Sequence, residues 1–176
     1  MTDKFTVGLL VNNRFGVLNR VTGLFRKRGY NIDSLAVGET ENPEYSRITI
    51  VCTGSEYMCE QVLRQLDKLV DVIQIVAFDP ADTVSAEHLM LKLRVSADAK
   101  PVISDLINYY SGKVRDFGAD YITAEFIAAT DVINEIIEAS RRFGILETCR
   151  SGAIAMTRGV GNMLIHNSDG SERENL

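Results

Sequence analysis

The chain has 176 residues, with 19 lysines and arginines against 24 aspartates and glutamates, so its formal net charge at pH 7 is −5. A hydrophobic share of 45% is typical of a globular protein and excludes a disordered or fibrous chain. The acidic balance argues against a nucleic-acid-binding surface, and no apolar run approaches the roughly 20 residues that would span a membrane.

Cysteine and histidine are scarce in this sequence. Three unclustered cysteines, Cys52, Cys59 and Cys149, fit a reducing compartment better than a disulfide framework. The N-terminus lacks the charged-then-apolar pattern of a signal peptide, so we expect a cytoplasmic protein. With His88 and His166 far apart and no cysteine pair at ligand spacing, we expect no metal site.

The first half of the chain carries alternating strand and helix patterns. Alternating apolar residues predict a strand over residues 5–12, and an apolar stripe ending in three basic residues predicts a helix over 17–28. Leu10 breaks the alternation and indicates burial on both faces of that strand. Strands over 31–37 and 46–53, a helix opened by Ser55 and a strand over 72–78 complete the order β-α-β-β-α-β of a ferredoxin-like fold.

The second half repeats this order after a break at Asp79 and Pro80. The patterns predict strands over 89–95, 113–117 and 121–128, a helix opened by Pro101 and a second helix capped by Thr130. They also predict a closing strand over 145–156 that is broken near residues 150–152. We therefore predict an α+β protein with two ferredoxin-like domains in tandem. The predicted divisions are a domain over 1–79, a linker over 80–86, a second domain over 87–158 and a flexible tail over 159–176.

Catalytic signatures are missing from the sequence. It contains no nucleophile elbow, phosphate-binding loop, dinucleotide fingerprint or closely spaced pair of histidines. Cys149 is interpreted as a packing residue rather than a nucleophile, and His88 as a surface or edge residue. The sequence therefore does not indicate an enzyme with a catalytic site of its own.

The most informative segment is the loop Asn13-Arg14-Phe15-Gly16, which places a helix N-terminus directly after a strand. Free N–H groups at Gly16, Val17 and Leu18, together with the helix dipole, favour an anion there. Asn31 follows the other end of the helix, so Asn13 and Asn31 would meet only if two copies of the chain pack together. A carboxylate on the amides and an ammonium on the asparagine oxygens would together describe a free α-amino acid. The alternative is that these residues only shape turns.

The same residues carry a resemblance to a known family, the small regulatory subunit of acetolactate synthase. The N-terminal half resembles an ACT domain, the amino-acid-sensing version of the ferredoxin-like fold. The resemblance extends over nearly the whole chain except the tail. The matching segments are residues 13–21, 24–35, 40–43, 46–51, 65–72, 143–147, 150–152 and 155–159.

The resemblance implies a subunit without catalytic residues that binds the large subunit of acetolactate synthase, raises its activity and confers feedback inhibition by valine or another branched-chain amino acid. It implies no cofactor in this chain, because thiamine diphosphate, Mg and FAD are expected only in the large subunit. It also implies a homodimer that holds the effector between paired ACT domains. In this sequence the matching positions are Asn13, Gly16 and Val17 of one chain and Asn31 and Ile32 of the other. The amides would take the carboxylate, the asparagines the polar head, and Ile32 would line an apolar pocket.

Two positions depart from the family pattern, which usually has Glu and Pro where this chain has Asn12 and Phe15. Loss of the proline frees the loop backbone, and the Phe15 ring is placed to narrow or cover the pocket. The alternative function is a stand-alone ACT-domain sensor that regulates another enzyme. A third reading, a small enzyme on the ferredoxin-like fold, is disfavoured by the missing catalytic signatures.

Overall fold

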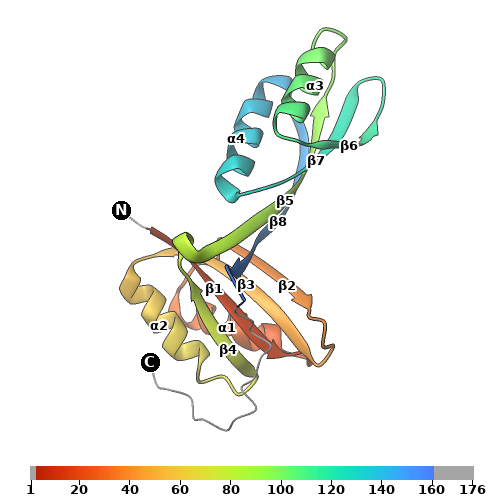
Figure 1. Cartoon of the computed structure of the whole chain (residues 1–176). Coiled ribbons are helices and arrows are strands. Elements are labelled where there is room, and N and C mark those ends of the chain that lie inside the picture. The colour runs from red at the N-terminus through yellow and green to blue at the C-terminus, as the bar shows by residue number, and fades with distance from the viewer. Residues whose placement is uncertain (1–2, 161–176) are drawn as a thin grey trace.

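The computed structural model describes residues 3–160 and contains two four-stranded antiparallel sheets, each with two helices on one face (Figure 1). The strand order is β2-β3-β1-β4 in the N-terminal sheet and β6-β7-β5-β8 in the C-terminal sheet. Both halves follow the order β-α-β-β-α-β. The predicted pair of ferredoxin-like domains is therefore confirmed.

The N-terminal domain closely follows the expected elements. They are β1 (Asp3–Asn12), α1 (Val17–Arg28), β2 (Ser34–Glu39), β3 (Tyr45–Gly54), α2 (Glu56–Leu66) and β4 (Val72–Phe78). Only β2 differs clearly, because it begins at Ser34 rather than at residue 31. The Asn31 side chain donates to the Asp33 carboxylate, and this local bond holds the residues before β2 in a turn instead of a ladder.

The C-terminal domain corrects two predictions. Its elements are β5 (Thr83–Arg94), α3 (Lys100–Tyr109), β6 (Lys113–Phe117), β7 (Tyr121–Ala128), α4 (Thr130–Ser140) and β8 (Ile145–Thr157). The predicted linker over 80–86 is too long, because only the short 3-10 helix at Pro80–Asp82 connects the domains and Thr83 already pairs with Thr157. Thr130 is the first residue of α4 and not its cap, which is Ala129.

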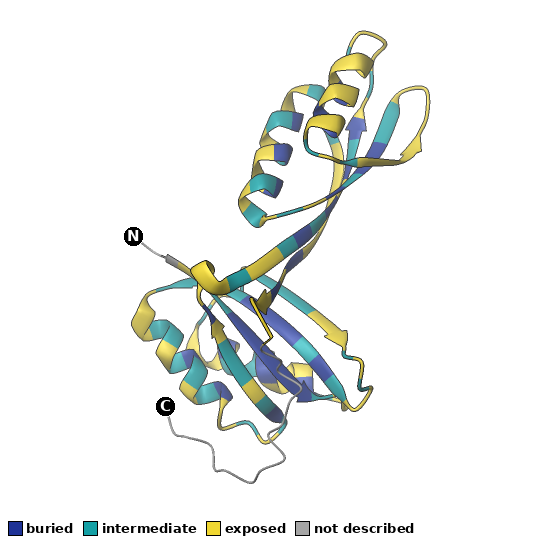
Figure 2. Ribbon diagram, viewed as in Figure 1, coloured by how far each residue is buried: buried dark blue, intermediate teal, exposed yellow. Residues whose placement is uncertain are grey.

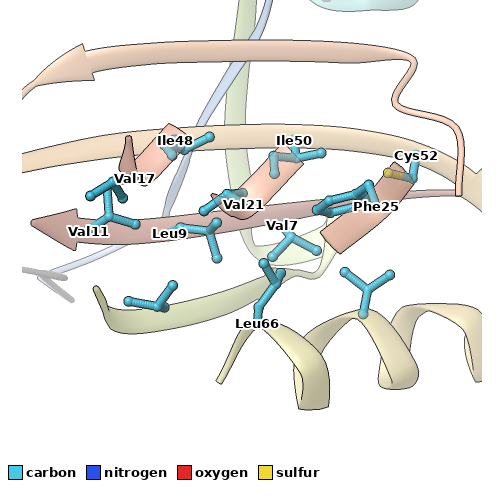
Figure 3. Packing of buried hydrophobic residues seen from close by; sticks show 12 residues of the cluster. Val7, Leu9, Val11, Val17, Val21, Phe25, Ile48, Ile50, Cys52 and Leu66 are labelled. Atoms are coloured by element: carbon cyan, nitrogen blue, oxygen red, sulfur yellow. The ribbon is translucent and has the colours of Figure 1, made fainter. Parts of the chain in front are cut away.

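The helices pack on one face of each sheet through their apolar stripes. In the N-terminal domain Val17, Val21 and Phe25 of α1 lie against the inward residues of β1 and β3, with Leu66 of α2 beside them (Figure 3). Residues three, four and seven apart share one helix face, which is why the sequence stripe becomes this contact. Figure 2 shows the buried residues in dark blue along the central strands of each sheet.

Strands β5 and β8 form a long ribbon that belongs to both domains (Figure 1). One end lies in the C-terminal sheet, and the other crosses the helix-free face of the N-terminal sheet, where Ala153 and Ala155 are buried. Leu10 points to this face and is only 2% exposed, which confirms its predicted burial. The Arg47 guanidinium donates to the Ala155 carbonyl at 2.6 Å, and burial lowers the pKa of Arg47.

The predicted break in the closing strand is a bulge rather than an interruption. The register of β8 against β5 shifts between the partners of Glu87 and Leu89, opposite residues 150–153. Gly152 within the bulge has φ of 76°, and a Cβ there would lie 3.1 Å from the Cβ of Ser34 in β2. Glycine at this position therefore permits the close approach of the ribbon to the N-terminal sheet.

Within residues 3–160 there is no helix long and apolar enough to cross a membrane. Of the predicted tail, Gly159 and Val160 are described, and residues 161–176 lie outside the described part of the chain.

Candidate functional site

The loop between β1 and α1 leaves backbone donors free at the start of the helix. Gly16 is the N-cap of α1 and adopts a left-handed conformation with φ of 83°, a region that only glycine enters without strain. No side chain caps the helix, and its first turn contains no acidic residue. Within residues 3–160 the amides of Gly16 and Leu18 donate no hydrogen bond. The positive end of α1 is thus open to an anion.

Val17 takes a different position from the one expected for an effector contact. Its amide donates within the turn to the Arg14 carbonyl at 3.3 Å, and its side chain is buried in the domain core. Of the three amides predicted to be free, those of Gly16 and Leu18 are the better placed for a ligand. The long 3.3 Å bond of Val17 is weak and easily exchanged for a stronger acceptor.

Asn13 is held in one orientation by two acceptors. Its Nδ2 donates to Oε1 of Glu39 and to the carbonyl oxygen of Pro43, each at 3.0 Å. Both amide hydrogens are thereby used, and Oδ1 is the group left to contact a ligand. The sequence did not point to Glu39, because 26 residues separate it from Asn13. Only the strand register, with Asn12 opposite Tyr45 and Glu39 opposite Ser46, brings the two together.

Asn31 and Ile32 lie in the turn that leads into β2. Nδ2 of Asn31 donates to Oδ1 of Asp33 at 3.1 Å. Oδ2 of Asp33 accepts from the Thr53 hydroxyl at 2.5 Å and lies 3.8 Å from the Lys4 ammonium, so this carboxylate is firmly placed. Ile32 is half-buried and packs against the edge of the N-terminal core.

The five predicted site residues form two separate groups in one chain. Asn13, Gly16 and Val17 lie at the start of α1, whereas Asn31 and Ile32 follow its end. A helix of 12 residues is about 18 Å long, more than twice the span of an amino acid. Within one chain the two groups therefore lie too far apart to contact one amino acid together.

Three apolar side chains in the loop before α1, in α1 and in β2 are exposed to solvent. Phe15 is fully exposed at the tip of the loop, and Leu18 of α1 and Val37 of β2 are also exposed. A ring as exposed as that of Phe15 is free to contact a partner or a ligand.

A cleft of about 660 Å³ lies between the domains. The ribbon, β2 and the start of α4 line it. Glu87 in this cleft is 3% exposed, and Arg150 binds it through two hydrogen bonds of 2.5 and 2.8 Å. The guanidinium also donates to Asn134 of α4 at 3.0 Å. Hydrogen bonding to Arg150 lowers the pKa of Glu87, and the same pair raises the pKa of Arg150. This ion pair joins β5 to β8 and, through Asn134, to α4 in the wall of the cleft.

The remaining reactive side chains do not assemble into a second site. Burial raises the pKa of the Cys52 thiol to about 12, so it stays protonated. Cys149 is exposed, which makes its interpretation as a packing residue wrong: β8 places it on the helix-free face of the C-terminal sheet, opposite Met90. His88 is partly exposed on the same face, and the described residues hold no cluster of metal-binding side chains.

Comparison with known proteins gives the same picture over both domains. Residues 7–74 match the model of the ACT domain of acetohydroxyacid synthase (AHAS) small subunits, and residues 86–159 match that of the small subunit of acetolactate synthase. A probable acetolactate synthase small subunit of Methanothermobacter thermautotrophicus is 38% identical, over 92% of this chain and 96% of that protein. The small subunit of Mycolicibacterium smegmatis is 36% identical, over 90% and 93%.

A solved structure supports the assignment. The acetolactate synthase small subunit of Thermotoga maritima superposes with a TM-score of 0.84 at 32% identity, over 90% of this chain and 99% of that one. Sequence similarity, both family models and the shared two-domain fold thus agree along the described length. The chain belongs to the family of acetolactate synthase small subunits.

Proposed function

We propose that this protein activates the catalytic large subunit of acetolactate synthase and makes it sensitive to feedback inhibition by valine or a related branched-chain amino acid. The pair of half-sites at the two ends of α1 carries this proposal. One end offers backbone amides and an asparagine oxygen, and the other offers a second asparagine beside an apolar side chain. Thiamine diphosphate chemistry then belongs to the large subunit, and this chain supplies binding and regulation.

The half-sites become complete in a homodimer with a two-fold axis. If α1 of one chain packs antiparallel to α1 of its copy, the start of each helix lies opposite the end of the other. Asn13 and Gly16 of one chain then face Asn31 and Ile32 of the second. Gly23 in the middle of α1 supports this packing, because a Cβ there would meet only open space and a second helix has room to approach.

The chemistry of the joined site matches a branched-chain amino acid. The carboxylate is placed on the amides of Gly16 and Leu18 at the positive end of α1, and exchange of the Arg14 contact adds the amide of Val17. The ammonium is placed against asparagine oxygens, and Ile32 lies beside the aliphatic side chain. Phe15, exposed in one chain, is covered by the partner or by the ligand.

Titration calorimetry with valine, leucine and isoleucine tests the site. We expect the wild type to bind at least one of them, and Asn13→Ala to weaken binding by at least tenfold, since an unpaired ammonium is costly. Asn108→Ala, an exposed asparagine on α3, is the matched control and leaves the affinity unchanged. Equal affinity in Asn13→Ala and the wild type would remove Asn13 from the site.

Mixing two variants tests the shared architecture. Asn13→Ala and Asn31→Ala should each bind poorly alone. In a mixed dimer one of the two sites carries both substitutions and the other carries neither, so an equal mixture, half of whose dimers are mixed, regains about a quarter of the wild-type sites. If subunit exchange restores no binding, Asn13 and Asn31 of one site do not come from different chains.

Mixing the chain with a catalytic large subunit of acetolactate synthase distinguishes this proposal from the alternative of a stand-alone sensor. We expect the chain to co-elute with the large subunit and raise its turnover, and valine to reverse the increase. A sensor for another enzyme would bind the amino acid yet neither co-elute nor change turnover.

A further inference from the structure

We propose that Glu39 is a positioning residue that sets which ligand class the effector site accepts. It fixes the Asn13 amide so that the side chain presents an oxygen, and the site then selects a free α-amino acid over the 2-oxo acid with the same side chain. This inference rests on the proposed function and adds a residue that determines its specificity.

The orientation of Asn13 follows from the chemistry of its neighbours. The Glu39 carboxylate and the Pro43 carbonyl both accept hydrogen bonds and donate none, and both lie 3.0 Å from Nδ2. Rotating the amide by half a turn would place Oδ1 against two acceptors. That arrangement loses two hydrogen bonds and adds repulsion, so the oxygen stays turned away from Glu39.

The strand register keeps Glu39 in place. Glu39 is the last residue of β2 and pairs with Ser46, while Asn12 at the end of β1 pairs with Tyr45 on the same strand. The backbone amide of Asn13 also donates to the Glu44 carbonyl at 2.7 Å. Both sides of the Asn13–Glu39 bond are therefore anchored by β3 rather than by a free loop.

The second half-site repeats part of the arrangement, with one acceptor in place of two. Nδ2 of Asn31 donates to Asp33, a carboxylate that Thr53 holds from its other oxygen. Rotation of the Asn31 amide would again place oxygen against oxygen. Each asparagine of the site is thus backed by its own acidic residue, and each has Oδ1 available.

This arrangement selects a hydrogen-bond donor. Asn13 has no N–H left to give, so a ligand must donate to it, and an ammonium group does so with a charge. The negative charge of Glu39 polarises the amide and makes Oδ1 a stronger acceptor. A 2-oxo acid has a carbonyl oxygen where the amino acid has its ammonium, and that oxygen would face Oδ1 without a hydrogen between them.

Titration calorimetry with L-valine and with its deaminated counterpart 3-methyl-2-oxobutanoate tests the proposal on the full-length chain. We expect the wild type to prefer valine strongly. Glu39→Leu removes the acceptor and lets the Asn13 amide rotate, so valine binding weakens by about tenfold and the preference over the 2-oxo acid shrinks. Glu39→Gln keeps an acceptor oxygen and restores most of the preference.

Glu41→Leu is the matched control. Glu41 is an exposed carboxylate in the same turn and makes none of the side-chain hydrogen bonds found within residues 3–160. The Glu41→Leu variant should bind valine and the 2-oxo acid with the affinities of the wild type. A general disturbance of the turn would weaken both ligands equally and would not be rescued by glutamine.

The outcomes separate this inference from the proposed function. If the wild type binds valine but Glu39→Leu keeps both the affinity and the preference, Glu39 has no positioning role and the effector site stands. If the wild type binds none of the branched-chain amino acids, the effector site is wrong and this inference falls with it.

Discussion

The two domains share one topology but treat the start of their first helix differently. In the C-terminal domain the Ser96 carbonyl accepts from the amides of Ala99 and Lys100, both at 3.1 Å, and the Ser96 hydroxyl lies 3.3 Å from the amide of Ala99. Pro101 then removes a further donor from the first turn of α3. In the N-terminal domain the amides of Gly16 and Leu18 have no such acceptor within the described residues. Ser96 thus supplies acceptors for the first two amides at the start of α3, whereas the loop before α1 supplies an acceptor only for the amide of Val17.

The helix-free faces of the two sheets also differ. The ribbon covers that face in the N-terminal domain and buries Leu10. On the C-terminal sheet the corresponding face stays open, with Met90 at 41% exposure and Ile127 exposed beside it. One domain therefore has a core on both sides of its sheet, and the other has a core only under its helices.

The largest expected effect tests this difference in burial. Leu10→Ala should lower the free energy of unfolding by about 2–4 kcal/mol, because it opens a cavity between the N-terminal sheet and the ribbon. Met90→Ala, on the central strand of the other sheet, should cost less than about 1 kcal/mol because water already reaches the side chain. Urea unfolding followed by circular dichroism measures both. Equal losses would mean that the ribbon does not cover the N-terminal sheet in solution.

The buried ion pair between β5 and β8 should give the next largest effect. Arg150→Met leaves the Glu87 carboxylate buried without its partner and should cost about 2–3 kcal/mol. Lys92→Met breaks the exposed Lys92–Glu147 pair on the same sheet and should cost at most about 0.5 kcal/mol. Thermal and urea unfolding compare the two variants. If Arg150→Met lowers the free energy of unfolding as little as Lys92→Met does, the Glu87–Arg150 pair is exposed to solvent and not buried.

Acid should remove the contribution of the same pair. Arg150 lowers the pKa of Glu87 in the folded chain, so the ionised pair adds stability above the usual carboxyl pKa of about 4. That stability is lost as the pH falls from there through the lowered pKa. Unfolding free energies measured from pH 7 to pH 3 should therefore fall more in the wild type than in Arg150→Met. Parallel curves would contradict the direction of the shift.

Most of the elements could be predicted from the sequence because each depends on local periodicity. The stripe of Val17, Val21 and Phe25 predicts α1 wherever the rest of the chain lies. The wrong predictions occur where contacts between residues far apart in the sequence determine the secondary structure. Thr83 and Ser85 look like a polar linker, but they form the start of β5 because β8 pairs with them. Their polar side chains line the cleft between the domains.

The candidate site likewise has a part that the sequence predicts and a part that depends on the tertiary structure. The Asn-x-x-Gly loop and Asn31 are visible in the sequence, since a strand, a glycine turn and a helix start follow one another directly. The contact of Asn13 with Glu39 is not, because it arises from the order β2-β3-β1 and the register along it. The exposure of Cys149 likewise depends on the tertiary structure, because β8 places this residue on the helix-free face of the C-terminal sheet.

A smaller expected loss of stability tests whether the starts of α1 and α3 have separate roles. Ser96→Ala removes the hydroxyl at the start of α3 and should cost about 0.5–1 kcal/mol of stability, with no change in valine affinity. Asn13→Ala, an exposed side chain, should show the reverse: little change in stability and at least a tenfold loss of valine affinity. Urea unfolding and valine titration on the same two samples give all four values. A change in valine affinity in Ser96→Ala would mean that the C-terminal loop also takes part in binding, and that the two copies of the fold have not divided these roles.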